Sequence, residues 1–134
     1  MTGGDEPRFL EPATVFWLHR RSLELFGGLN GVRDPGALDS ALSSAKNAWH
    51  YGNGDAYDVA AAYAFHIAES QAFLDGNKRT AVACALTFLG GCAIPVPRDD
   101  GQLYSAMIAI AHRRLDKAGL AELLRKQFPG PAVE

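Results

Sequence analysis

The sequence predicts an all-α fold, a helical bundle of about six helices around a buried central helix. Apolar residues recur at helical spacing in six segments, and the apolar-polar alternation that marks a half-buried strand is nearly absent. Residues that start or stop helices stand at the boundaries of these segments. With 134 residues the chain suits one domain, residues 1–134, that can bury a core of its own.

The first two helices have well-marked boundaries. Pro12 fits the first turn of a helix that ends at Gly27-Gly28. Asp34-Pro35 supplies an N-cap and a first-turn proline for the second helix. The segment from Trp49 to Asp55 then combines ring side chains with two glycines, which favours a loop or a short hairpin.

The third and fourth helices form the expected centre of the fold. Asp58 can cap an alanine-rich third helix that runs to about Glu69. A loop from Ala72 to Asn77 leads into a fourth helix, from Lys78 to Leu89, which has no polar face after its first turn. A helix that is apolar all round is a buried one, so we expect this helix to be the central one.

The fifth helix, from Asp100 to His112, and the sixth, from Asp116 to Gln127, are expected to pack around that centre because each carries one apolar stripe. Residues 1–7 and 129–134 are expected to be flexible ends.

Composition and charge exclude several classes of protein. The net charge of -2 gives no argument for binding nucleic acid or an anionic membrane. Cys84 and Cys92 lie in apolar surroundings, which favours buried thiols over a disulfide or a metal pair. The polar, acidic N-terminus does not resemble a signal peptide, and the longest uncharged stretch is broken by Gly90-Gly91 and Pro95. We therefore expect a cytoplasmic protein.

The segment from Gln71 to Thr80 carries the chemistry. Gly76 allows close approach of the backbone to a ligand, and Lys78 and Arg79 then open a helix whose first amides lack partners. Two cations at this positive end cost about 0.3–1 kcal/mol each, a cost that a bound phosphate would offset. From spacing alone, a phosphate site and an ordinary solvated turn both remain open.

Three neighbouring residues complete the expected site. Asp75 adds the single carboxylate that Mg²⁺ needs beside phosphate oxygens. Phe73 is expected to anchor the loop to the core, and Thr80 belongs to the same phosphate-binding segment.

The segment resembles the signature of the Fic/Doc superfamily, His-x-Phe-x-Asp/Glu-Gly-Asn-Lys/Gly-Arg. Six residues match the signature in order and spacing: Phe73, Asp75, Gly76, Asn77, Lys78 and Arg79. The stretch from Gly27 to Gly36 is similar to the corresponding part of the death-on-curing (Doc) branch, and the helix order agrees from about Arg8 to Phe128. The resemblance thus covers nearly the whole chain.

The resemblance implies that ATP and Mg²⁺ bind at this loop and that part of the ATP is transferred to a protein hydroxyl. Lys78, and Val82 in place of a further arginine, favour a Doc-type kinase over an AMP-transferase, which remains an alternative. By resemblance, such a toxin phosphorylates a translation elongation factor and is neutralised by a small antitoxin protein. The chain has no Ser/Thr-x-x-x-Glu-Gly/Asn motif that would inhibit it from within.

The resemblance also assigns roles within the loop. The backbone from Gly76 to Arg79 would grip the phosphates, Lys78 and Arg79 would neutralise the charge that develops, and Asn77 would orient the phosphoryl group. The flap that positions the target would fall at Trp49, His50 and Tyr51, although these rings could equally cap the core.

One residue departs from the signature. Gln71 stands where the family has the histidine that acts as general base, and a carboxamide cannot take that proton near neutral pH. The loss of a general base costs about 10²–10⁴-fold in rate. His66 is a poor substitute because it lies roughly 140° around the same helix from position 71.

Three interpretations of Gln71 are open: a natural variant with lost or altered activity, a laboratory substitution, or a natural residue in an enzyme whose substrate is already a good nucleophile. Two further functions therefore compete with a weakened toxin kinase. One is a pseudoenzyme that binds nucleotide or an antitoxin-like partner, and the other is a helical interaction domain with a vestigial loop.

Other candidate residues are expected to be structural. His19, and His112 with Arg113-Arg114, are expected on solvated helix faces. Arg33 and Asp34 are expected to cap and pin the second helix.

Overall fold

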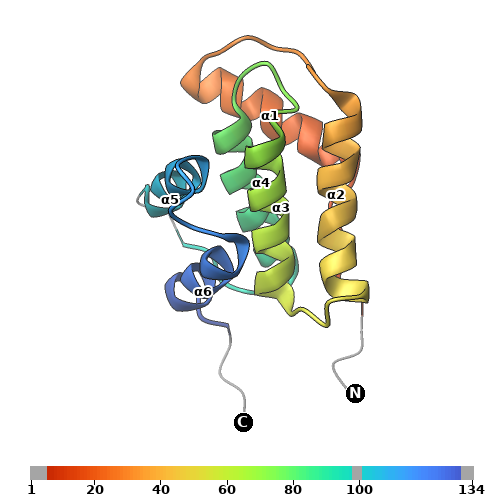
Figure 1. The fold of residues 1–134 in the computed structure, drawn as a ribbon, viewed down its shortest axis with the longest axis vertical. Helices are drawn as coiled ribbons and strands as arrows, with labels where there is room; N and C mark the ends of the chain where they lie inside the picture. Colours follow the sequence, from red (N-terminus) through yellow and green to blue (C-terminus); the bar gives the residue numbers. More distant parts are fainter. Residues whose placement is uncertain (1–5, 98–100, 131–134) are drawn as a thin grey trace.

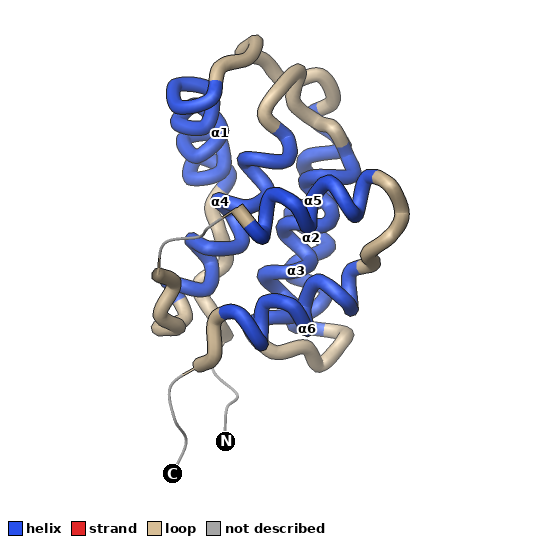
Figure 2. The backbone as a smooth tube through the Cα atoms, turned by 90° about the vertical axis from the view of Figure 1, so that its left-hand side faces the viewer, coloured by secondary structure: helices blue, strands red, loops and turns tan. Residues whose placement is uncertain are grey.

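The computed structural model describes residues 6–97 and 101–130, and these residues form α-helices joined by loops, with no strand among them (Figures 1 and 2). The helices are α1 (Pro12–Phe26), α2 (Pro35–His50), α3 (Ala56–Ser70), α4 (Asn77–Gly91), α5 (Gln102–Ala111) and α6 (Lys117–Gln127). The predicted all-α bundle is confirmed. None of the helices within the described ranges is long and apolar enough to cross a membrane.

Helix α3 lies at the centre of the bundle. It packs against α2 on one side and α4 on another, and α5 and α6 cover it from a third direction (Figure 1). Every residue from Val59 to Ala64 is at most 1% exposed. The expected central helix, α4, is less enclosed, because its Thr87 is exposed and its Val82 and Leu86 are only half-buried. The alanines of α3 explain the difference, since small side chains let neighbouring helices approach from every side.

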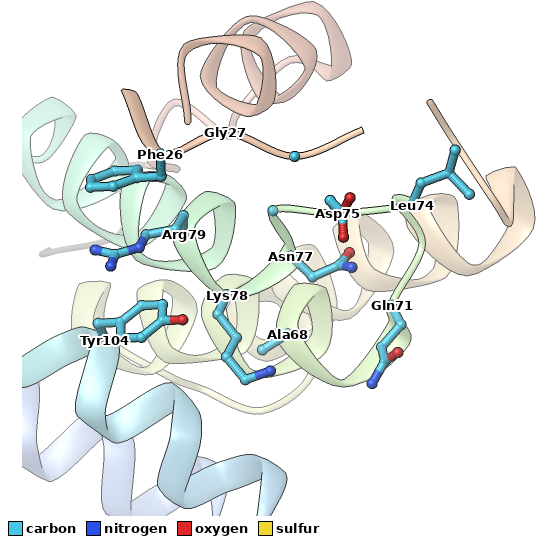
Figure 3. Close-up of a pocket in the computed structure, with 12 residues that line it drawn as sticks. Phe26, Gly27, Ala68, Gln71, Leu74, Asp75, Asn77, Lys78, Arg79 and Tyr104 are labelled. Carbon is cyan, nitrogen blue, oxygen red and sulfur yellow. The ribbon is translucent and has the colours of Figure 1, made fainter. Parts of the chain in front are cut away.

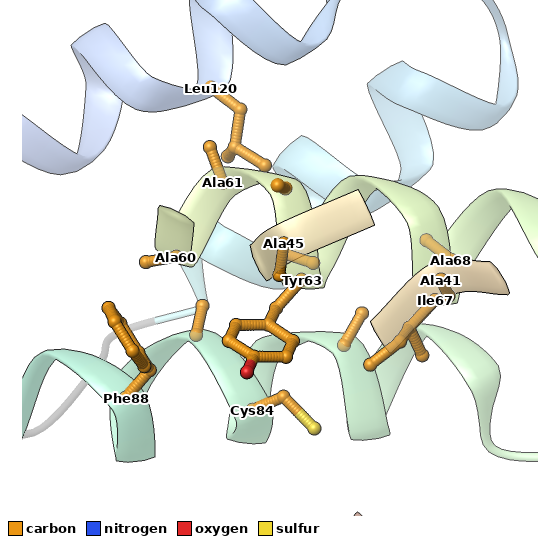
Figure 4. Packing of buried hydrophobic residues seen from close by; sticks show 14 of the residues in the cluster. Ala41, Ala45, Ala60, Ala61, Tyr63, Ile67, Ala68, Cys84, Phe88 and Leu120 are labelled. Atoms are coloured by element: carbon orange, nitrogen blue, oxygen red, sulfur yellow. The ribbon is translucent and has the colours of Figure 1, made fainter. Parts of the chain in front are cut away.

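Large side chains of α3 itself and of the neighbouring helices fill the core between them (Figure 4). Tyr63 is fully buried and its hydroxyl accepts a hydrogen bond from the Leu10 amide at 2.9 Å. Cys84 is also fully buried, and this burial raises the pKa of its thiol to about 12. Both cysteines are free thiols, as predicted. A thiol with such a pKa is protonated and unreactive at neutral pH.

Side-chain caps fix the starts of three of the six described helices, α2, α3 and α6. Asp34 caps α2 as predicted, with its carboxylate accepting from the Ala37 amide at 3.0 Å. Asp116 caps α6 in the same way through the Gly119 amide at 2.7 Å. The fifth helix begins at Gln102, and the predicted start at Asp100 lies outside the described residues.

Helix α4 begins one residue before the predicted Lys78 and runs past the predicted end at Leu89 to Gly91, and α5 ends one residue early at Ala111. Two further boundaries differ for identifiable reasons. Asp55, rather than Asp58, caps α3, and the two aspartates form a reciprocal capping box in which each side chain accepts from the other's amide at 3.0 Å. Helix α2 continues to His50, so Trp49 and His50 are helical and only residues 51–55 form the connection. Of the two predicted alternatives for this connection, the loop is present at residues 51–55 and the short flap hairpin is not.

The predicted flexible ends lie mostly outside the described residues. In the described part of the N-terminal segment, the Glu6 carboxylate lies 3.1 Å from His50 Nε2. This contact attaches the beginning of the described chain to the end of α2.

Candidate functional site

A cavity of about 500 Å³ opens beside the loop that joins α3 to α4, residues 71–76 (Figure 3). Its lining comes from the loop, from the ends of α1 and α3, from the first turn of α4 and from α5. The lining residues are Phe26, Gly27, Gly28, Ala68, Gln71, Leu74, Asp75, Gly76, Asn77, Lys78, Arg79 and Tyr104. The loop that the sequence singled out therefore faces the cavity.

The loop is attached to the segment between α1 and α2 by its main chain. Val32 and Phe73 form an isolated antiparallel bridge. The Arg33 amide donates to the Ala72 carbonyl at 2.6 Å, and the Leu74 amide donates to the Gly31 carbonyl at 3.0 Å. Side chains take no part in these bonds, so backbone pairing attaches this part of the loop independently of side-chain identity.

Phe73 anchors the loop, as predicted. It is buried, and its ring stacks on the imidazole of His19 with the centroids 3.8 Å apart. His19 Nε2 lies 2.8 Å from the Asp75 carbonyl oxygen, to which it can donate. The prediction of a solvated His19 is wrong, because only 2% of this residue is exposed. His19 instead supports the loop through its contacts with Phe73 and Asp75.

Asn77 holds the loop closed. Its side-chain oxygen accepts from the Phe73 amide and its side-chain nitrogen donates to the Phe73 carbonyl, both at 3.0 Å. The polar atoms of the side chain are thus engaged by the loop itself. Asn77 therefore has a structural role in the loop, and because it also lines the cavity, its expected contact with a phosphoryl group stays a prediction.

Asp75 and Gly76 lie where the loop meets α4. Oδ2 of Asp75 accepts from the Leu29 amide at 2.7 Å, and Oδ1 has no hydrogen bond to a described residue. Gly28 permits this approach, because a Cβ there would lie 2.9 Å from Asp75 Cβ. Gly76 has φ +80°, in the left-handed region that favours glycine.

The donors here fit a nucleotide phosphate. Within the described chain, neither a side-chain cap nor a loop carbonyl accepts from the amides of residues 77–79 at the start of α4. Lys78 and Arg79 line the same cavity, and neither forms an ion pair with a described carboxylate. Unpaired amides at a helix start together with two cations form a suitable site for a polyphosphate.

A magnesium ion would have one protein carboxylate here. No cluster of three or more His, Cys, Asp or Glu side chains that could hold a metal occurs within residues 6–97 and 101–130. Asp75 with a free Oδ1 fits the usual arrangement for Mg²⁺, in which one or two carboxylates act together with substrate phosphates and water.

Arg79 lies between two aromatic rings, a feature that the sequence did not predict. Its Cζ atom is 3.9 Å from the centroid of the Phe26 ring and 3.8 Å from that of Tyr104 (Figure 3). The rings come from α1 and α5, which both pack on α4. Each contact is within cation–π range.

Gln71 terminates α3 in the left-handed conformation, with φ +48°. Its side chain is exposed at the cavity and has no hydrogen bond to any described residue, whereas its carbonyl accepts from Arg33 Nε at 3.0 Å and Nη2 at 2.8 Å. Arg33 therefore ties the segment just before α2 to the end of α3 and does not line the cavity, which agrees with its predicted role of pinning the second helix.

Two other candidates lie away from the cavity. Thr80 is fully buried and does not line it, so the structure does not bring this hydroxyl to a phosphate. His66 faces Lys117, whose Nζ lies 3.1 Å from His66 Nε2. Burial, with a smaller effect from Lys117, lowers the pKa of His66. His66 cannot replace a base at position 71. His112, Arg113 and Arg114 are exposed, as predicted.

Comparison of the sequence with known proteins identifies the family of this chain. A model of the Fic/DOC family matches residues 9–89. "Protein kinase doc" of Escherichia phage P1 is 29% identical over 122 residues, which cover 90% of this chain and 96% of the phage protein. "Toxin Doc" of Mycolicibacterium smegmatis is 40% identical over 102 residues, which cover 72% of this chain and 77% of that protein. The chain therefore belongs to the Fic/DOC family, within its Doc branch.

Proposed function

We propose that this chain is a Doc-type toxin that transfers a phosphate from ATP to a Ser or Thr hydroxyl of a translation factor, with activity limited by Gln71. The observation that carries the proposal is the convergence on one cavity of free helix amides, two cations, one carboxylate and the residue at the base position. A relative named as a protein kinase supports this reaction, and a relative named as a toxin supports the biological role.

In the proposed mechanism the start of α4 binds the phosphates. The amides of residues 77–79 donate to phosphate oxygens, and Lys78 and Arg79 neutralise the charge that builds during transfer. Asp75, whose Oδ1 is free, would be the residue that holds Mg²⁺. ATP with Mg²⁺ supplies the phosphoryl group in an electrophilic form. Asn77 contributes indirectly by keeping the loop in the shape that presents these groups.

Gln71 sets the limit on activity. Its carboxamide can hydrogen-bond to a hydroxyl and orient it but cannot accept its proton near neutral pH. We expect a rate lower by about 10²–10⁴-fold than that of a chain with histidine at this position. Because Gln71 is exposed and its main chain is held by Arg33, we expect a histidine to be accommodated there.

We also propose a small antitoxin protein as partner, a cytoplasmic location beside the translation machinery, and residues 1–134 acting as one domain. Doc-type toxins imply such a partner, and one relative carries the name of a toxin.

The presence of glutamine at position 71 favours a second candidate function. In this case the chain would be a pseudoenzyme that binds nucleotide or an antitoxin-like partner and catalyses no reaction. The cavity and its donors would serve binding as well as they would serve catalysis. An AMP-transferase is a weaker alternative, because Lys78 is typical of the Doc branch by resemblance.

Two experiments separate these functions. Calorimetry with ATP and Mg²⁺ tests binding, and heat is expected from this chain but not from one with a vestigial loop. Gln71→His and a Gln71→Ala control are then incubated in translation extracts with ATP labelled on either the γ- or the α-phosphate. Transfer of γ-label by the histidine variant alone supports a kinase that lacks only its base, and transfer of α-label indicates AMP transfer. The absence of labelling by every variant, with ATP binding intact, would leave the pseudoenzyme.

A further inference from the structure

We propose that Phe26 and Tyr104 are positioning residues that hold Arg79 in the orientation in which it receives the phosphates; this inference rests on the proposed function. The guanidinium lies between the two ring faces, with its Cζ atom 3.9 Å and 3.8 Å from their centroids. Tyr104 lies outside the residues that the family model matches, so the pair of rings, here called the aromatic clamp, joins a family motif to a part of the chain beyond it.

The clamp leaves the hydrogen-bond donors of Arg79 available. A guanidinium is planar, and all its N–H groups point outward in that plane. Rings above and below therefore fix the plane without using a donor, whereas a carboxylate partner would use two. Within the described residues Arg79 has no carboxylate partner, although it lines the cavity. The side chain is thus ordered and still able to bind an anion.

The exposure of Phe26 fits this role. This ring is the last residue of α1 and 58% of it is exposed, so burial in the core does not explain its position. Among the described residues, the Phe26 ring makes its ring contact with the guanidinium of Arg79. Tyr104 approaches from the opposite side on α5, and Figure 3 shows the arginine lying between the two. The slot between the rings is already filled by the guanidinium.

The alternative role for these rings is to stack on the adenine of ATP. Calorimetry with two probes, ATP with Mg²⁺ and inorganic tripolyphosphate with Mg²⁺, separates the two roles, because the second probe has no base. The variants are Tyr104→Leu, the conservative Tyr104→Phe, and Phe26→Leu at an exposed position where folding is at little risk. Thermal unfolding followed by circular dichroism checks that each variant is folded.

Ordering one flexible side chain on binding weakens affinity about two- to tenfold. We therefore expect Tyr104→Leu and Phe26→Leu to weaken binding of both probes by about that factor, and Tyr104→Phe to bind like the parent. In an Arg79→Lys background the effect of Tyr104→Leu should largely disappear, since an ammonium has no plane to hold. In the ligand-free parent, ring currents should shift the Arg79 Hε signal upfield in NMR spectra, and Tyr104→Leu should reduce the shift.

Three outcomes would overturn the clamp. Weakening of ATP binding alone would show that the rings stack on the base. An equal effect of Tyr104→Leu with arginine or lysine at position 79 would show that Tyr104 does not act through Arg79. Binding unchanged in both leucine variants would leave the clamp without a function. A parent chain that binds neither probe would contradict the proposed function itself, and the clamp would fall with it.

Discussion

Arg33 donates two hydrogen bonds to the main-chain carbonyl of Gln71, from Nε at 3.0 Å and from Nη2 at 2.8 Å. The two residues are 38 positions apart, and the contact joins the segment before α2 to the end of α3. Because the acceptor is a backbone oxygen, the bond fixes where residue 71 lies whatever its side chain is. It also satisfies a carbonyl at a helix C-terminus, where the helix has no partner for it.

Removal of this contact should destabilise the fold modestly. Arg33→Met deletes both hydrogen bonds, and since the side chain is exposed we expect a loss of about 1 kcal/mol in the free energy of unfolding. Urea denaturation measures it. Arg20→Met is the matched control, because Arg20 is exposed on α1 without a hydrogen bond or ion pair to a described residue, and it should change stability by less than about 0.5 kcal/mol. Equal effects of the two substitutions would contradict a special role for Arg33.

Asn77 should matter for stability more than for direct contact with ATP. Asn77→Ala leaves the amide and carbonyl of the buried Phe73 without partners, and we expect a loss of about 2 kcal/mol in urea denaturation. Asn77→Asp keeps the acceptor but not the donor and should lie between the parent and the alanine variant. If Asn77→Ala lost ATP binding while its stability matched that of the parent, Asn77 would be a ligand contact after all.

Thr80 offers the opposite test. Its hydroxyl is fully buried and no described residue hydrogen-bonds to it. Thr80→Val keeps the shape of the side chain and removes a hydroxyl whose unpaired burial costs about 1 kcal/mol. The free energy of unfolding of the variant should therefore rise by up to about 1 kcal/mol. Calorimetry should show unchanged ATP binding. Weaker ATP binding by the valine variant would restore Thr80 to the phosphate site.

The ion pairs that attach α6 to α3 should be sensitive to acid. Arg125 Nη2 lies 3.0 Å from both Asp55 Oδ1 and Asp58 Oδ2. Burial opposes ionisation of Asp58, but hydrogen bonds from Asp55 and the charge of Arg125 outweigh it and lower the pKa below its usual 3.8. A lowered carboxyl pKa stabilises the fold above the unfolded pKa, and this contribution is lost as pH falls through the folded pKa.

Arg125→Met should therefore cost about 1 kcal/mol at pH 7, and the difference from the parent should shrink as the pH falls below 3.8. Urea denaturation at pH 7, 5 and 3 measures this. Arg21→Met removes an exposed ion pair with Glu24 at 3.2 Å and should have a smaller effect at pH 7. A difference that grew toward low pH would show that the carboxylates do not supply the stabilisation.

The sequence predicted those parts of the fold that depend on neighbouring residues. The cap Asp34 and the start of the sixth helix at Asp116 depend on residues within one helical turn, so both could be found from spacing. The start of α3 was misplaced because Asp55 and Asp58 are both capable caps and each serves the other. The rings at the end of α2 suggested a loop, but helix propensity is weak and packing can extend a helix through such residues.

The site was predicted only where a motif marked it. Phe73 was assigned correctly as the anchor, whereas His19, which lies beneath it, was taken for a solvated residue. The contact between His19 and Asp75 spans 56 positions, and no local pattern reports it. The aromatic clamp likewise unites the end of one helix with the first turn of another through Arg79. Such long-range contacts depend on how the helices pack against one another, and the hydrophobic periodicity of the sequence does not determine that packing.

The backbone pairing that holds the α3–α4 loop has a consequence for how the chain can change over generations. Because main-chain bonds, the buried Phe73 and the side chain of Asn77 hold the loop, the side chain at position 71 can be exchanged with little effect on folding. A lineage could lose its proton acceptor there under selection against toxicity, keep an intact binding surface, and regain the acceptor by a single substitution.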